Sequence, residues 1–556
     1  MKKKKIILII FLVLLILILP GAVYYKIQLC KLTYFYTYFQ RMDDDYITQN
    51  QKKIDIYKYD LAFDLYPEEK MFIAKAVLTG KVLDSAILSI DLNFYDNFEI
   101  KKILLNEVST EYENEGSRLS IPFSPLYGKE FKIEVQYKGT PKKVGLEGFV
   151  FGKRNGTSLV YNLSEPNYAS SWFPCNDVPF DKTSLDISIS NDSGMVSVSN
   201  GVLIDVTTTG SRRTYHWRTE YPISTYLVAI YSSDYEYFSD QYISLDGKDT
   251  MRVEYYVLSD KLENAKVDFP GHVKILEVFS QMFGEYPFLK EKYGVAEFLW
   301  YAGAMEHQTI TGVSSNMISG KNFFEDTYVH ELAHQWWGNA VSPKSWKDIW
   351  LNEGFSTYSE ALYYESVSGK EALQSTMMSK YSPNFSGSLD EPGPFLFTRT
   401  MYDKGAWVLH MLRWEVGDIS FFKILRTYYE SFKYSNASTK DFKDVCERVS
   451  GMKLDKFFEQ WVYSKGQIDL EYKTETIKSE NNYLTKLSLQ QVQEDYAEFY
   501  FPLEIKMTFS DGIEKKFRYE IMSQDTLLEI STEAIPDSIE LDPDRWLLAQ
   551  INMIDE

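Results

Sequence analysis

Two histidines near the middle of the chain have the spacing of ligands for one zinc ion. His330, Glu331 and His334 form the pattern His-Glu-x-x-His. On a helix, residues four apart lie on the same face, so that both imidazoles can bind one ion. Glu331 cannot bind that ion at the same time, but it lies beside the open coordination position and can take a proton from water there. The pattern predicts a zinc site with Glu331 as general base.

A third ligand is expected on the next helical segment. Glu353 follows His334 after 18 intervening residues and opens a second helical pattern. Two histidines and one glutamate leave a fourth position open, as in catalytic rather than structural zinc sites. Glu360, seven residues beyond Glu353 and on the same face, is expected to orient a zinc-binding imidazole. The alternative is that these residues are solvated helix charges and hydrogen-bonded core histidines.

Further motifs surround the predicted ligands. Residues 303–307 read GAMEH, residues 330–339 read HELAHQWWGN and residues 352–355 read NEGF. Residues 162–165 read NLSE, shortly before WFPCND, and residues 401–406 read MYDKGA. In order and spacing these motifs resemble those of the gluzincin zinc aminopeptidases, the family that includes aminopeptidase N and leukotriene A hydrolase. The resemblance covers most of the chain.

The resemblance implies a role for several further residues. Glu165 and Glu306 are expected to bind the free α-ammonium of the substrate, and the phenol of Tyr402 to stabilise the tetrahedral intermediate. The rest of the first motif is expected to contact the substrate through Gly303, Ala304 and Met305.

Two positions depart from the family pattern. His307 stands where the family usually has Asn, and Leu163 where it usually has Gln. Neither change removes an expected anchoring carboxylate. The change at Leu163 falls beside the expected pocket for the first substrate residue.

Together these residues predict a zinc-dependent aminopeptidase, with one zinc ion per chain, that acts on peptides with a free amino terminus. Three alternatives remain: an endopeptidase, a lipid-epoxide hydrolase on the same site, or a non-catalytic interaction module. Glu165 and Glu306 argue against a pure endopeptidase, and the complete ligand set argues against a non-catalytic module. Side-chain preference and oligomeric state stay open.

The pattern of apolar residues changes twice along the chain. Residues 54–245 alternate apolar and polar positions, residues 246–466 have helical periodicity, and residues 467–556 return to alternation. This order predicts an α+β multidomain protein. The resemblance implies a saddle-like N-terminal β domain, a thermolysin-like helical catalytic domain and a small C-terminal β-sandwich.

The amino terminus has the composition of a membrane anchor. Residues 2–5 are lysines, residues 6–19 are all aliphatic or aromatic, and residues 6–25 contain no charge. This length suffices to span a bilayer, and the lysines favour a cytoplasmic amino terminus. Residues 1–25 are therefore expected to be a signal anchor and residues 26–53 a juxtamembrane linker, with the catalytic domain outside the cytoplasm. The alternative is a cleaved signal and secretion.

The overall composition excludes several classes. The 556 residues carry 79 acidic and 59 basic side chains, a net charge of −20 that argues against nucleic acid as a partner. Three scattered cysteines cannot form a disulfide framework or a cysteine-zinc module.

Overall fold

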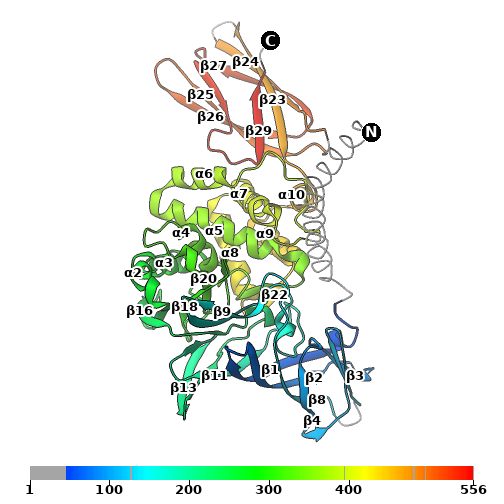
Figure 1. Ribbon diagram of the computed structural model, residues 1–556. Helices are drawn as coiled ribbons and strands as arrows, with labels where there is room; N and C mark the ends of the chain where they lie inside the picture. The colour runs from blue at the N-terminus through cyan, green and yellow to red at the C-terminus, as the bar shows by residue number, and fades with distance from the viewer. Residues whose placement is uncertain are drawn as a thin grey trace, which may run out of the picture.

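The structure is a computed structural model that describes residues 46–84, 86–124, 128–393, 395–479, 482–494 and 496–554. β-rich segments lie at the two ends of the molecule, and a mainly helical part lies between them (Figure 1). This order confirms the predicted α+β multidomain fold.

The N-terminal part is built on one large sheet and two smaller ones. Long strands β1 and β2 pair antiparallel at its centre, and their buried positions alternate with exposed ones, as the sequence pattern predicts. The eight strands in spatial order are β13 (Val202–Thr209), β14 (Arg212–Arg218), β11 (Ser184–Asp192), β1 (Ile54–Tyr66), β2 (Met71–Val82), β8 (Glu130–Gly139), β4 (Glu99–Leu105) and β5 (Val108–Ser109).

The two smaller sheets complete the N-terminal part. One contains β12 (Val196–Val198), β15 (Tyr231–Ser233), β10 (Thr157–Leu163) and β9 (Gly148–Arg154), and the other β3 (Ser89–Asn93), β7 (Arg118–Pro122) and β6 (Glu113–Glu115). Arg154, at the end of β9 and opposite the start of β10, forms an ion pair with buried Glu297 of the central part. At the other end of β10, Leu163 and Glu165 line a cavity together with residues of the central part.

The central part combines a mixed sheet with helices. Its sheet contains β16 (Glu236–Ile243), β17 (Thr250–Val257), β18 (Tyr293–Phe298), β20 (Thr311–Ser314) and β19 (Ala304–Met305). Because β16 pairs with β17 along its whole length, this sheet begins at residue 236, and the expected boundary at residues 245/246 falls inside the β16–β17 turn.

The helices of the central part have apolar stripes or are buried on all sides. Phe421, Ile424, Leu425 and Tyr428 form the buried face of α8, whereas every residue of α5 from Trp350 to Tyr363 is buried. The helices are α2 (Leu262–Asp268), α3 (Gly271–Phe283), α4 (Glu325–Ala333), α5 (Trp350–Ser368), α6 (Lys370–Ser379), α7 (Gly405–Val416), α8 (Asp418–Phe432), α9 (Thr439–Ser450) and α10 (Asp455–Trp461). A short parallel pair, β21 (Val341–Pro343) and β22 (Ser435–Ala437), joins the loop after α4 to the loop after α8.

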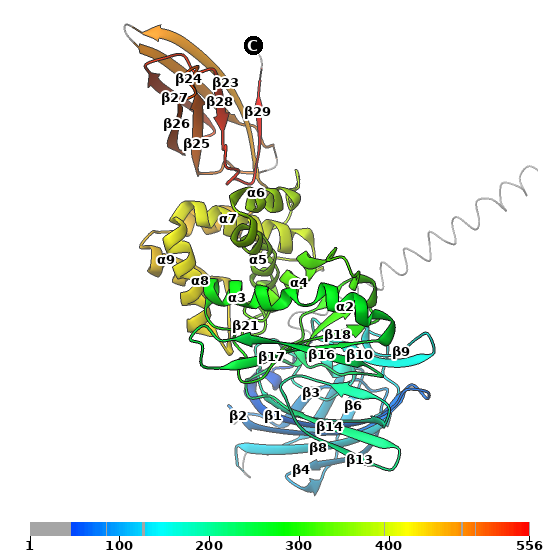
Figure 2. The same cartoon turned by 90° about the vertical axis from the view of Figure 1, so that its left-hand side faces the viewer.

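The C-terminal part consists of two sheets of mainly antiparallel strands that rest on α6 and α7 (Figure 2) and on α10 (Figure 1). Lys370 pairs with Asp544, and the indole of Trp414 donates to the carbonyl of Pro502. The strands are β27 (Asp525–Thr532), β24 (Asn482–Gln491), β23 (Ile468–Ser479) and β29 (Ala549–Met553) in one sheet, and β26 (Glu514–Ile521), β25 (Phe501–Thr508) and β28 (Ser538–Leu541) in the other.

The predicted membrane segment, residues 1–25, lies outside the described residues, as does most of the linker. Within the part of the chain that the structure describes, no helix has the length and apolar character needed to cross a bilayer. The anchor therefore stays a prediction.

Helices α5 and α7 approach each other closely through two glycines. A Cβ atom added to Gly354 would lie 2.8 Å from the Cα of Gly405, and one added to Gly405 would lie 2.8 Å from the Cα of Gly354. The atoms met are backbone, so the contact leaves no room for a side chain. Gly354 follows Glu353, and Gly405 comes three residues after Tyr402, so this contact sets the separation of two predicted site residues.

Replacing Gly405 with Ala should therefore force the two helices apart and lower the free energy of unfolding by about 1–3 kcal/mol. Gly271→Ala is the matched control, because Gly271 is also helical and nothing lies within 4 Å of an added Cβ there. That variant should be neutral or slightly stabilising. Denaturant melts followed by circular dichroism make the comparison, and equal midpoints for the two variants would contradict the packing argument.

Candidate active site

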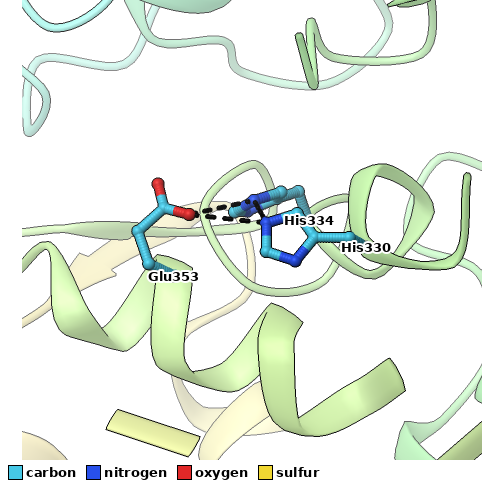
Figure 3. Close-up of side chains that lie close together, drawn as sticks. All are labelled: His330, His334 and Glu353. Atoms are coloured by element: carbon cyan, nitrogen blue, oxygen red, sulfur yellow. Dashed lines mark hydrogen bonds and ion pairs between the residues drawn. The ribbon is translucent and has the colours of Figure 1, made fainter. Parts of the chain in front are cut away.

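Helix α4 presents the two histidines toward Glu353 of α5 (Figure 3). The Nε2 atoms of His330 and His334 lie 3.0 Å apart, and Oε2 of Glu353 lies 3.5 Å from each. His334 follows the last residue of α4, and its backbone N–H still donates to the carbonyl of His330. The turn of α4 thus brings the two histidines together, and α5 adds Glu353 as the third predicted ligand.

The other ring nitrogens have fixed partners. Nδ1 of His330 lies 2.9 Å from Oε1 of Glu360, and Nδ1 of His334 lies 2.9 Å from the carbonyl oxygen of Trp337. Because these partners are acceptors, each Nδ1 donates, and in the neutral rings each Nε2 carries a lone pair. Two lone pairs thus face one another beside a buried carboxylate oxygen that has no hydrogen-bond partner. This donor set fits zinc.

The surroundings favour a positive charge at this place. Burial opposes protonation of His330, but its contacts with Glu353 and Glu360 outweigh burial and raise its pKa to about 10. A metal ion would take the place of this proton. The site therefore has the charge balance of a cation site as well as its geometry.

Glu360 joins the ligand helix to a lysine that the sequence motifs do not include. Its second carboxylate oxygen lies 2.7 Å from Nζ of Lys380, just beyond the end of α6. One oxygen of Glu360 thus positions His330, and the other oxygen is positioned by Lys380. No motif or helical spacing connects Lys380 to Glu360, so only the fold reveals this partner.

A cavity of about 450 Å³ contains the candidate ligands together with the other predicted site residues. The residues that line it and were predicted from sequence are Glu165, Gly303, Ala304, Met305, Glu306, His330, Glu331, His334, Glu353, Glu360 and Tyr402. Leu163 lines it as well. The fold thus gathers residues from all four motifs of the central part and from the N-terminal β part into one place.

Glu165 and Glu306 face each other in this cavity. With Glu353 they each offer an oxygen, and the three oxygens lie within 4.8 Å of one another. Oε1 of Glu165 and Oε1 of Glu306 are buried and have no hydrogen-bond partner. Burial raises the pKa of both carboxyls, and for Glu165 the charge of Glu306 adds to the effect. A cationic donor placed between them would relieve both penalties.

The backbone of Glu306 is held by the segment that follows α4. Its carbonyl oxygen accepts from the side-chain amide of Asn339 at 2.7 Å and from that of Gln335 at 3.3 Å. His307 turns into the core, where its Nδ1 lies 2.6 Å from the hydroxyl of Tyr231. The histidine that replaces the family's Asn therefore leaves the Glu306 carboxylate in the cavity.

Glu331 lies beside the ligands without binding them. Its Oε2 is buried and has no hydrogen-bond partner. Burial raises its pKa to about 8, although the neighbouring His330 opposes the shift. A carboxyl with such a pKa can both accept and return a proton near neutral pH.

Tyr402 reaches the cavity from an irregular turn. It lies in a π-helical segment, η8 (Thr400–Lys404), that runs directly into α7. Its ring lies almost parallel to that of His330, with centroids 5.8 Å apart. Burial raises the pKa of the phenol, so it stays protonated and can donate a hydrogen bond. The motif predicts the residue, whereas nothing in the sequence indicates the π turn.

Sequence reasoning missed about half of the cavity wall. The apolar lining comes from separate loops and contains Leu146, Trp300, Met317, Phe395 and Phe397, and the remaining polar lining contains Asp326, Thr327, Thr357, Lys380 and Asp403. Apart from Asp403, which belongs to the motif at residues 401–406, these residues belong to no motif, so only the folded chain brings them together.

Two family models match the chain over the parts that build this site. The Peptidase M1 N-terminal domain matches residues 56–227, and the Peptidase family M1 domain matches residues 268–461. The chain belongs to peptidase family M1. The second match contains every candidate zinc ligand, and the first contains Glu165.

Curated M1 relatives are named as aminopeptidases. Probable aminopeptidase 2 of Sulfurisphaera tokodaii is 25% identical over 388 residues, 65% of this chain and 49% of that protein. Aminopeptidase M1-C of Oryza sativa subsp. japonica is 29% identical over 401 residues, 66% of this chain and 43% of that protein. The chain thus spans about half the length of these relatives.

Solved structures similar to this chain include an M1 metallopeptidase. An M1 zinc metallopeptidase mutant of Deinococcus radiodurans, bound to a Tyr-Ser-Ala substrate, is 25% identical with a TM-score of 0.66, over 74% of this chain and 95% of that one. Aminopeptidase A of Legionella pneumophila, in complex with aspartic acid, shares the fold at 17% identity, with a TM-score of 0.78 over 91% of this chain and 60% of that one. The family that the motifs indicated is confirmed, and so is zinc as the cofactor. The roles of individual residues stay proposals.

Replacing Glu360 with Gln should weaken zinc binding about 10- to 100-fold, because His330 would lose the charged acceptor that orients it. Competition with a chromogenic chelator measures the affinity. Glu371→Gln on the exposed side of α6 removes the same charge away from the site and should leave zinc affinity unchanged. Equal affinities for the two variants would remove Glu360 as the residue that positions the ligand.

Proposed function

We propose that this protein is a zinc-dependent aminopeptidase that removes residues from peptides with a free amino terminus. The observation that carries the proposal is the pair of buried carboxylates, Glu165 and Glu306, that share one cavity with the zinc ligands and have unpartnered oxygens. An α-ammonium group carries both the charge and the three N–H donors that such a pair requires.

The position of this pair sets which bond is cut. A peptide whose ammonium lies between Glu165 and Glu306 can extend only a short way before it reaches the zinc ligands. Its first carbonyl group therefore lies at the metal, and later ones lie beyond it. A blocked amino terminus would leave two buried carboxylates unpaired, which is costly.

Residues around the metal supply the remaining chemistry. Zinc, when bound, lowers the pKa of water and polarises a carbonyl oxygen. Glu331 accepts the proton from the attacking water and returns it to the leaving amine, a task that suits its raised pKa. The phenol of Tyr402 donates a hydrogen bond to the oxygen on which negative charge develops.

Relatives support the proposal. The curated M1 proteins of Sulfurisphaera tokodaii and Oryza sativa carry aminopeptidase names, and the Deinococcus radiodurans enzyme was solved with a tripeptide substrate. Within the described residues, no feature favours epoxide hydrolysis or internal cleavage over removal of the first residue.

The deciding experiment offers the zinc-loaded full chain one peptide in two forms, with a free and with an acetylated amino terminus, each with and without a chelator. Mass spectrometry of the products should show stepwise loss of single residues from the free form only, and the chelator should abolish it. Cleavage of both forms, or internal cleavage, would indicate an endopeptidase. Failure to cut either form with zinc bound would refute the proposal.

The ammonium anchor makes a separate prediction. Glu306→Gln keeps the shape of the side chain but removes its charge, so kcat/KM for a free peptide should fall about 100-fold or more. The low rate on the acetylated peptide should change much less. Glu254→Gln, also buried and in β17 of the central sheet but outside the cavity lining, tests whether loss of any buried glutamate has this effect. Equal losses on free and acetylated peptides would exclude the anchor role.

A further inference from the structure

Asp326 occupies the first turn of α4, at the opposite end of the cavity from the ammonium anchor. It comes four residues before His330 and therefore lies on the same face of the helix, about 6 Å along its axis. Unlike the buried acids of the site, Asp326 is exposed, and with Thr327 it lines the cavity. Neither residue belongs to a motif.

The order of groups along α4 gives the cavity a direction. Glu306 lies at the His334 end, because Gln335 and Asn339, in the segment just after His334, donate hydrogen bonds to its carbonyl oxygen. Glu360 contacts His330, one turn nearer the amino end of the helix. Asp326 comes one turn further still. A peptide anchored at Glu306 thus passes the zinc ligands before it reaches Asp326.

The carboxylate of Asp326 has no cation of its own among the described residues. Its Oδ1 accepts from the backbone N–H of Thr327, which leaves Oδ2 available. Lys380 interacts electrostatically with Asp326 but forms its ion pair with Glu360. Asp403, which also lines the cavity, pairs with Arg399. The end of the cavity that holds Asp326 is therefore negative, and the Asp326 carboxylate has no cationic partner among the described residues.

We propose that Asp326 binds a basic side chain on the second residue of the substrate, so that the enzyme favours peptides whose second residue is Lys or Arg. The second residue begins just past the cut bond, and consecutive Cα atoms are about 3.8 Å apart. A long cationic side chain there can reach one helical turn from His330, whereas the first residue lies on the far side of the metal. This inference rests on the proposed aminopeptidase activity.

The test compares kcat/KM for the tripeptides Ala-Lys-Ala and Ala-norleucine-Ala, whose second side chains have similar length and differ in charge. The native zinc enzyme should prefer the lysine peptide about fivefold, about 1 kcal/mol, as expected for a partly exposed ion pair. In Asp326→Asn the preference should disappear. In the native enzyme it should weaken as salt is added.

Two controls separate this effect from others. Glu325→Gln removes a neighbouring charge from the same helical turn but outside the cavity lining, and should keep the preference. The peptides Lys-Ala-Ala and norleucine-Ala-Ala carry the charge on the first residue, and their ratio should not change in Asp326→Asn. An unchanged Ala-Lys-Ala preference in that variant, or an equal change with Lys-Ala-Ala, would overturn the assignment. Absence of cleavage of every free peptide would instead refute the proposed function itself.

Discussion

Four buried carboxylates in one cavity are the constraint around which this protein is organised. Glu165, Glu306, Glu331 and Glu353 repel one another, and burial disfavours the charge on each. Among the described lining residues, His330 and His334 are the basic side chains next to these carboxylates, and Lys380 pairs with Glu360 instead. The four carboxylates therefore outnumber the basic groups beside them. In the proposed function, a metal ion at one end and a substrate ammonium at the other supply the missing positive charge, so that affinity for both would follow from one electrostatic imbalance.

Such an arrangement requires rigid support. Glu353 and Tyr402 come from different helices, and the contact between Gly354 and Gly405 fixes how closely those helices approach. Glu165 comes from the N-terminal β part, which the Arg154 ion pair joins to the central sheet. Because these elements pack directly against one another, the four carboxylates stay close together even though they repel one another.

The sequence predicted the chemistry of the site better than its shape. His330 and His334 follow helical spacing, which is local, and Glu353 opens the next helical pattern, so pattern and fold agree. The order of β, helical and β segments is also local and is confirmed. The wall formed by Trp300, Met317 and Phe397 depends on where loops meet, and nothing short-range encodes that. Asp326 likewise belongs to no motif, and only the folded chain shows that it lines the cavity.

The hydrogen bonds from Gln335 and Asn339 to the Glu306 carbonyl have a consequence for substrate geometry. They tie Glu306, the proposed ammonium anchor, to the segment that carries His334, so that the distance from this anchor to the metal site would be fixed. The site would therefore accept only a first residue whose ammonium nitrogen and carbonyl carbon are separated by one backbone atom. A β-amino acid has one extra backbone carbon, which would place its carbonyl beyond the metal. Peptides that begin with such a residue should be bound by their ammonium group and yet escape cleavage.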